Sequence, residues 1–145
     1  MPTRTAHTTW TGGLQDGTGT VTLVSSGIGS YEISFPKRAA DDADGTTSPE
    51  ELIAAAHAGC FAMQFSALLG AAGASQQSLD VTADVTLGPD PAGGFRISGI
   101  KLTVGGSAEG ISAEDFGKIA NDAKSACPVS KALTGTDITL AVAGG

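Results

Sequence analysis

Two short stretches near the start of the chain carry the alternation of apolar and polar residues that is typical of half-buried β-strands. Thr20–Ser25 and Tyr31–Phe35 are rich in β-branched and aromatic residues, and glycines separate them. We therefore predict a β-meander with tight turns within His7–Pro36. The next segment, Lys37–Thr47, has three Asp and no apolar periodicity, which predicts a solvated loop or short irregular turn that contains Arg38.

Alternating segments return in the second half of the chain. Leu79–Leu87 has an apolar residue at every second position, and Phe95–Val104 repeats the pattern after the turn sequence GPDPAGG. These segments predict two antiparallel strands. Asp137–Val142 predicts one last strand.

The strongest helix signal lies between the two groups of strands. Ser48, Pro49 and Glu51 fit the N-cap, first and third positions of a capping box. Apolar residues then recur at spacings of three and four, which predicts a helix that ends near Gly70 or Gly73 and is buried on most sides. These apolar residues are Leu52, Ala55, Ala56, Cys60, Phe61, Met63, Phe65, Leu68 and Leu69.

A second helix is predicted at Ala113–Ala126, with Ser112 as its N-cap and one apolar face. Pro128 disfavours a helical conformation at Cys127 but suits the first turn of a new helix, so we predict a short helix at Pro128–Leu133. The order strands, helix, strands, helix, strand favours an α+β fold in which antiparallel sheets cover central helices.

Length, charge and composition narrow the class of protein. A chain of 145 residues has the size of one domain, so we predict a single domain at residues 1–145. The net charge of −7 argues against nucleic acid and anionic membranes as partners. Because the sequence has no run of about 18 apolar residues and no signal-peptide pattern, we expect a soluble, cytoplasmic protein. The many Gly and Ala residues bury little area each, which favours a homodimer.

The two cysteines, Cys60 and Cys127, are the residues best suited to chemistry, but by themselves they leave several functions open. A reducing compartment disfavours a structural disulfide. Two packed thiols that act as small apolar side chains fit the sequence, and so does a reactive thiol with a partner thiol. A metal site needs more ligands than His57 and the distant His7 supply, so we predict no metal. We also expect no cofactor, because in a thiol-based reaction sulfur is both nucleophile and electron store.

A reactive Cys60 needs a nearby cation. Only about 3% of a free thiol is ionised at pH 7, and burial on an apolar helix face raises the pKa further. Cys60 also lies too far into its helix for the helix dipole to act on it. An Arg keeps its charge when desolvated and lowers the pKa of a neighbouring thiol by about 1 to 3 units. Arg38, in the loop that leads to the helix, is the best candidate.

Two roles are open for Glu50. A Glu in the first turn of a helix is favourable through the helix dipole alone. A carboxylate also holds an Arg side chain through two parallel hydrogen bonds, and Glu50 is a candidate to hold Arg38 in this way. Glu50 precedes Cys60 by ten residues, which is about 15 Å along a straight helix. Unless the helix folds back, Arg38 and Glu50 therefore meet the Cys60 of a second subunit.

Cys127 is expected at the N-cap of the short helix, where backbone amides suit a thiol that attacks or leaves. A buried turn cysteine is the alternative. His57 lies three residues before Cys60 on one side of the helix, but no acid is evident to orient it. We expect a packed His57 rather than the Cys-His pair of a cysteine hydrolase.

Two sequence blocks around the cysteines carry a resemblance to a known family. Thr47–Phe61 reads TSPEELIAAAHAGCF, and Ala123–Leu133 reads AKSACPVSKAL. With TADVTL at Thr82–Leu87 and the closing DITLAV, they make the chain resemble the osmotically inducible protein C branch of the OsmC/Ohr hydroperoxide reductases. The resemblance implies an OsmC-like fold, with two antiparallel sheets wrapped around two long central helices in an intertwined homodimer.

The resemblance also implies a role for each site residue. Cys60 resembles the family's peroxidatic thiolate and Cys127 its resolving thiol, while Arg38 and Glu50 occupy the places of the activating Arg and its Glu partner. The implied enzyme reduces organic hydroperoxides, and hydrogen peroxide more weakly, through a Cys60 sulfenic acid and a Cys60–Cys127 disulfide. The implied reductant is an external dithiol, such as a lipoyl-bearing protein.

A function of another class stays open beside this one. The same amino-acid composition is compatible with a non-catalytic dimer that binds an apolar ligand in a groove and uses its cysteines only for packing. An ordinary thiol pKa of about 8.5 for Cys60, with no disulfide after peroxide treatment, would favour that function.

Overall fold

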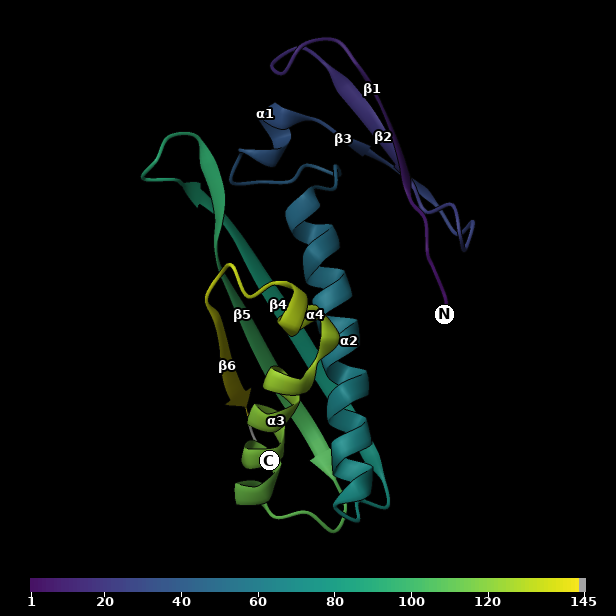
Figure 1. The fold of residues 1–145 in the computed structure, drawn as a ribbon, viewed down its shortest axis with the longest axis vertical. Helices are drawn as coiled ribbons and strands as arrows, with labels where there is room; N and C mark the ends of the chain where they lie inside the picture. The colour runs from purple at the N-terminus through teal and green to yellow at the C-terminus, as the bar shows by residue number, and fades with distance from the viewer. Residues whose placement is uncertain (144–145) are drawn as a thin grey trace. The chain divides into compact units, whose positions relative to one another are not determined.

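The computed structural model describes residues 1–143, and the chain divides into two compact units (Figure 1). The amino-terminal unit spans Met1–Pro49, and the carboxy-terminal unit spans Glu50–Gly145. Strands and helices in separate runs confirm the α+β class. The single domain at residues 1–145 stays a prediction, and its last two residues lie outside the described part of the chain.

The amino-terminal unit contains the predicted β-meander. Strands β1 (His7–Thr11), β2 (Thr18–Thr22) and β3 (Ser30–Ile33) pair antiparallel in the order β1-β2-β3. Glycine is needed on β2, because a Cβ at Gly19 would lie 2.8 Å from the ring of Trp10. The indole of Trp10 therefore lies close against the backbone of its neighbouring strand.

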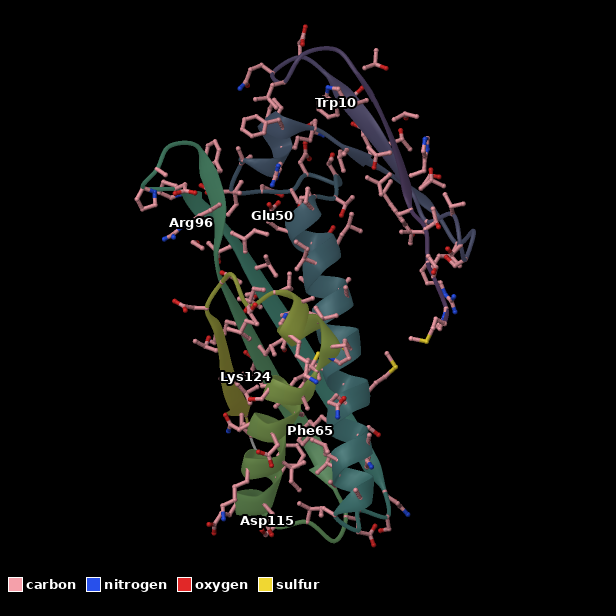
Figure 2. All side chains as sticks on the ribbon, in the orientation of Figure 1. Trp10, Glu50, Phe65, Arg96, Asp115 and Lys124 are labelled. Carbon is pink, nitrogen blue, oxygen red and sulfur yellow. The ribbon has the colours of Figure 1, made fainter. Side chains whose placement is uncertain are left out.

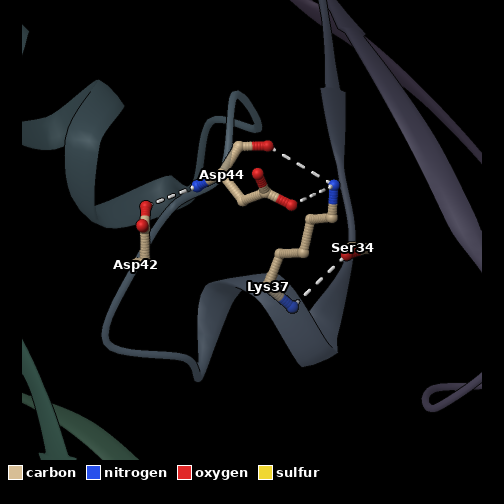
Figure 3. A network of polar contacts seen from close by, with 4 residues as sticks. All are labelled: Ser34, Lys37, Asp42 and Asp44. Carbon is tan, nitrogen blue, oxygen red and sulfur yellow. Dashed lines mark hydrogen bonds and ion pairs between the residues drawn. The ribbon is translucent and has the colours of Figure 1, made fainter.

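A short helix, α1 (Phe35–Arg38), follows the meander. Ser34 caps it and accepts a hydrogen bond from the backbone N–H of Lys37 at 3.4 Å (Figure 3). The Lys37 ammonium pairs with the Asp44 carboxylate at 3.5 Å, which ties the helix to the following turn (Figure 3). The prediction of an irregular segment from Lys37 onward was wrong at its start, because Ser34 and Pro36 favour a helical turn that ends at Arg38.

The carboxy-terminal unit is organised around a long helix, α2 (Pro49–Ala71). It begins at the predicted proline and ends between the two predicted glycines. Its end is a Schellman motif, in which Gly73 has φ +99° and the N–H of Ala74 donates to the carbonyl of Leu69 at 3.0 Å. A positive φ of this kind suits glycine because glycine has no Cβ.

The second sheet has one feature that the sequence did not predict. Strands β4 (Gln77–Pro89) and β5 (Phe95–Ala108) pair antiparallel as expected, but β6 (Ile138–Ala143) lies parallel to β5. The prediction of purely antiparallel sheets was therefore wrong for β6. The reason is that α3 (Ala113–Ala126) and α4 (Pro128–Ala132) form a crossover that returns the chain to the same end of the sheet. Both helices match their predicted positions.

The core of the carboxy-terminal unit lies between the sheet and the helices α2 and α3 (Figure 1). Phe65 of α2 is fully buried, and its ring centroid lies 4.9 Å from that of Phe116 on α3 and 5.6 Å from that of Phe61 (Figure 2). The buried cluster consists of Phe61, Phe65, Leu69, Leu102, Val104, Phe116, Ala120, Ala123 and Cys127. One of the two cysteines is thus part of the core.

Helix α2 is buried along one stripe only. His57, Phe61, Phe65 and Leu69 form this stripe at spacings of four, whereas Met63 on another side is 72% exposed. The sequence predicted that α2 is buried on most sides. In one chain taken by itself, this prediction is wrong. By length and composition alone, α2 is apolar enough to cross a membrane. Its buried stripe packs in the core of its own unit, which is also how the core helix of a soluble protein is built.

Candidate active site

The two cysteines lie side by side in the carboxy-terminal unit, although 67 positions separate them in the chain. Their sulfur atoms are 3.0 Å apart and share a hydrogen bond, and both residues are free thiols. Cys60, on α2, is half-buried, whereas Cys127 is completely buried. A disulfide bond is about 2.05 Å long, so the sulfur atoms of this pair must approach by about 1 Å to form one.

The surroundings of Cys60 favour its neutral thiol. Burial raises the pKa of Cys60, and the hydrogen bond and charge of Cys127 raise it further, while the backbone N–H of Val129 lowers it. Among residues 50–143, no cation contributes to the pKa of Cys60. The sequence-based expectation that burial raises this pKa agrees with this arrangement, whereas the need for a nearby cation stays a prediction.

The surroundings of Cys127 lower the pKa of its thiol. Burial raises the pKa of Cys127, but its contact with the Cys60 side chain, together with the nearby side chain and N–H of Ser130 and N–H of Val129, lowers it overall. Cys127 is the N-cap residue of α4, as predicted. Its sulfur forms no capping hydrogen bond with the helix backbone, yet the nearby N–H groups still stabilise a negative charge on it. The buried cysteine is therefore the more acidic of the two in this arrangement.

A polar pair lies next to the thiols. Nε2 of His57, on α2, lies 2.8 Å from the hydroxyl oxygen of Ser130, on α4, and both side chains are buried. Burial lowers the pKa of His57, which favours the neutral imidazole. The prediction of a packed histidine is confirmed, and its hydrogen-bond partner is Ser130 rather than Cys60. Sequence reasoning missed Ser130, although its position three residues after Cys127 places both on one side of a helical turn.

Arg38 lies in the amino-terminal unit, at the end of α1, and is half-buried. It lines a cavity of about 200 Å³ within this unit. The lining residues are Trp10, Leu14, Ile33, Ser34, Phe35, Arg38, Thr47 and Pro49. Within residues 1–49, this combination of aromatic and aliphatic walls with one guanidinium suits an apolar molecule that carries a polar group. The approach of Arg38 to a Cys60 sulfur stays a prediction.

Glu50 lies in the first turn of α2 and is 6% exposed. Helix α2 is continuous from Pro49 to Ala71, so Glu50 and Cys60 are about 15 Å apart along its axis. The alternative in which the helix folds back between them is therefore excluded. Among residues 1–143, no group of three or more His, Cys, Asp or Glu side chains is arranged to hold a metal ion.

The fold and the adjacent thiols define a small α+β protein with a dithiol site, and comparison with known proteins identifies its family. A family model described as "OsmC-like protein" matches residues 41–142. The chain belongs to the OsmC-like family. The resemblance inferred from the two cysteine blocks is thereby confirmed.

Three relatives illustrate this membership. Peroxiredoxin OsmC of Escherichia coli (strain K12) is 42% identical over 131 residues, which cover 90% of this chain and 89% of the relative. Organic hydroperoxide resistance protein OhrA of Bacillus subtilis (strain 168) is 40% identical over 101 residues, which cover 67% of each chain. The crystal structure of organic hydroperoxide resistance protein OhrB of Bacillus subtilis aligns with a TM-score of 0.74 at 29% identity, over 96% of this chain and 98% of that one.

Proposed function

We propose that this protein is a Cys-based peroxidase that reduces organic hydroperoxides, and hydrogen peroxide more weakly, to alcohols and water. The observation that carries the proposal is a reduced pair of sulfur atoms 3.0 Å apart, of which Cys60 is half-buried and Cys127 fully buried. A peroxide therefore reaches Cys60 first and leaves a partner thiol in position to react next. The names of the relatives, a peroxiredoxin and organic hydroperoxide resistance proteins, support the same function.

The proposed cycle has three steps. The Cys60 thiolate attacks the outer oxygen of ROOH, the O–O bond breaks, and the alkoxide takes a proton and leaves as alcohol. The Cys127 thiolate then attacks the sulfur of the Cys60 sulfenic acid, the S–O bond breaks as a disulfide forms, and the hydroxide that leaves takes a proton from solvent to become water. An external dithiol, such as a lipoyl-bearing protein, attacks the more accessible Cys60 sulfur, restores both thiols and is itself oxidised to a disulfide. Sulfur is both nucleophile and electron store, so the cycle uses no metal or organic cofactor.

In this proposal Arg38 supplies the cation that Cys60 lacks. Its guanidinium, held by Glu50, lies against the Cys60 sulfur of a second subunit and lowers the pKa of that thiol. The cavity beside Arg38 supports this role, because its walls of Trp10, Leu14 and Phe35 suit the organic part of a hydroperoxide. Preference for organic hydroperoxides over hydrogen peroxide follows from the area of apolar surface that only the former buries.

The proposed homodimer explains the exposed surface of α2. Ala55, Gly59 and Ala67 are exposed at spacings that are multiples of four, on either side of the exposed Met63. Small side chains on such a face allow a second helix to approach closely. An antiparallel pair of α2 helices that cross near Ala55, midway between Glu50 and Cys60, also brings Glu50 of one helix toward Cys60 of the other. A cytoplasmic location stays a prediction and is consistent with two reduced thiols.

The test of the function is mass spectrometry after one equivalent of cumene hydroperoxide. We expect a loss of two protons per chain, mapped to a peptide that joins Cys60 and Cys127. Cys60→Ser should abolish peroxide turnover, whereas Cys127→Ser should allow one oxidation per site and block recycling by dithiol. If either variant turns over at the wild-type rate, or if peroxide leaves both thiols unchanged, the peroxidase proposal is wrong. The apolar cavity would then favour a binding protein with structural cysteines.

A further inference from the structure

Trp10, on β1, is held in a fixed position against its neighbouring strand (Figure 2). It lies directly opposite Gly19 of β2 in the antiparallel pairing. A Cβ at Gly19 would lie 2.8 Å from Cε3 of the indole, and a Cβ at Gly17 would lie 2.8 Å from its Cζ2. Real Cβ atoms do not approach other atoms so closely. The indole therefore occupies the space that side chains at these two buried positions would need.

The polar edge of the indole is fixed as well. Its Nε1–H donates a hydrogen bond to the carbonyl oxygen of Gly12 at 3.0 Å, in the turn that follows β1. Two further hydrogen bonds close this turn, from the N–H of Gly13 to the Asp16 carboxylate and from the N–H of Gly17 to the carbonyl of Gly13, both at 2.8 Å. An indole has one donor and no acceptor, so the bond to Gly12 satisfies its only polar group. What Trp10 offers to a ligand is therefore apolar ring surface.

The ring surface that β2 leaves uncovered belongs to the cavity beside Arg38. Trp10 is 41% exposed and lines this cavity of about 200 Å³. Phe35 is a second aromatic wall, while Leu14 and Pro49 add aliphatic surface. An engineered apolar cavity of about 150 Å³ in another protein binds benzene. The cavity beside Arg38 therefore has the volume for one aromatic ring with a short substituent.

We propose that Trp10 is a specificity-determining residue that selects aryl hydroperoxides, with the aromatic ring of the substrate packed against the indole. The inference rests on the proposed function for the reaction itself, whereas the binding of the ring depends only on the cavity and the indole. Two aromatic rings attract each other beyond the area that they bury, and an alkyl group lacks this attraction. Because the indole is already fixed by β2 and Gly12, little side-chain freedom is lost when a ring binds to it.

The kinetic test compares cumene hydroperoxide with tert-butyl hydroperoxide, which has a methyl group in place of the phenyl ring. Trp10→Leu should lower the ratio of their kcat/KM values, cumene over tert-butyl, by about 2- to 10-fold, the contribution of an aromatic pair beyond buried area. Trp10→Phe keeps an aromatic wall and should retain most of this ratio. Both rates come from one sample, so the ratio does not depend on how much of a variant is folded. An unchanged ratio in Trp10→Leu would overturn the proposal.

Tyr31→Leu is the matched control. Tyr31 lies in the same sheet, on β3, and is 40% exposed, which is close to the 41% of Trp10. It is not among the residues of the amino-terminal unit that line the cavity. We therefore expect Tyr31→Leu to keep the wild-type ratio of kcat/KM values. A fall as large as that of Trp10→Leu would mean that the sheet rather than the indole sets the preference, which contradicts the inference.

A binding test separates this inference from the proposed function. Cumyl alcohol is the expected product of cumene hydroperoxide, and it carries the same ring but no O–O bond. Trp10 is the one Trp of the sequence, so its fluorescence reports on this cavity. We expect cumyl alcohol to change the emission of Trp10 saturably, and tert-butanol to need an about tenfold or higher concentration, because it also buries less apolar surface.

The two failures are distinguishable. If the emission does not respond to cumyl alcohol while cumene hydroperoxide is turned over, the role of Trp10 is wrong and the proposed function stands. If the emission responds saturably in a protein that reduces no hydroperoxide, the site for an aromatic ring stands and the peroxidase function is wrong.

Discussion

The two units of this chain differ in how well they cover their own apolar surface. In the carboxy-terminal unit, Phe61, Phe65 and Leu102 are completely buried between two helices and a sheet. Among residues 1–49, Val21 is the one apolar side chain that is buried, while Trp10 is 41% exposed. The same chain thus combines a unit with a closed core and a unit whose aromatic residues remain partly exposed.

This difference matches the division of chemical groups between the units. Both thiols lie in the well-packed unit, where close packing holds Cys60 and Cys127 at a fixed separation. Arg38 and the apolar cavity lie in the thinly packed unit. A nucleophile and its resolving partner need constant geometry, whereas a cation that meets different substrates tolerates a less rigid support. The comparison predicts that changes in one unit affect stability most and changes in the other affect activity most.

The largest expected effect is on the stability of the carboxy-terminal core. Phe65→Ala removes a fully buried ring that contacts both Phe61 and Phe116. We expect the free energy of unfolding to fall by about 3 to 5 kcal/mol, as for other large-to-small changes of buried aromatic residues. Trp10 in the other unit is 41% exposed, so Trp10→Ala should lower the free energy of unfolding clearly less. Urea unfolding of both variants measures this difference, and equal losses would show that the two units are equally well packed.

The next effect concerns activity rather than stability. If Arg38 lowers the pKa of Cys60 by about 1 to 3 units, Arg38→Ala should lower the thiolate fraction of Cys60 by about 10- to 1000-fold at neutral pH. Cys60 oxidation should slow by less than this factor, because a thiolate of higher pKa is more nucleophilic. Raising the pH should restore part of the rate, because the thiol then ionises without help. Arg38→Lys keeps the charge but loses the planar fork, so we expect an intermediate rate.

Stopped-flow measurement of thiol oxidation by a hydroperoxide checks this prediction. Lys37→Ala is the control, because it removes a neighbouring cation whose ion pair is with Asp44 on the surface. An Arg38→Ala rate equal to that of Lys37→Ala would remove Arg38 from the proposed mechanism. Urea unfolding of the same variants tests whether either substitution acts through stability instead.

The smallest effect is a pH dependence of stability that originates at His57. Burial lowers the pKa of His57 in the folded state, so below pH 6.5 the unfolded chain binds a proton that the folded chain does not. The contribution to stability is complete above the unfolded pKa of about 6.5 and is lost as the pH falls, by at most about 1.4 kcal/mol per pH unit. Urea unfolding between about pH 8 and pH 5 should show a shallower slope for His57→Gln than for the wild type. Identical slopes would mean that His57 takes up a proton without unfolding the core.

Local signals in the sequence predicted most of the secondary structure. Ser112 caps α3 by accepting a hydrogen bond from the N–H of Asp115 at 3.1 Å, and Pro128 begins α4. Such signals act within one turn of a helix and can be read without the rest of the fold. The segment before Arg38 shows their limit, because Ser34 and Pro36 formed a helical turn where the absence of apolar periodicity predicted a loop.

Contacts between distant residues escaped prediction for a common reason. The parallel pairing of β6, the contact of His57 with Ser130 and the one-sided burial of α2 depend on how helices and strands pack, and residue patterns do not record that packing. The family resemblance supplied the expectation that Cys60 and Cys127 act together. Their 3.0 Å separation could be measured only in the folded chain.

The amino-acid sequence by itself determined the order of strands and helices, the family, and the two thiols as candidates for chemistry, because caps, turns, periodicity and motifs are properties of neighbouring residues. Only the tertiary structure decided which thiol is the more acidic. The pKa of Cys127 depends on Ser130 and Val129 on the next helical turn, while that of Cys60 depends on burial against a core assembled from distant segments. Electric fields and solvent exclusion act through space, and the fold alone sets those distances.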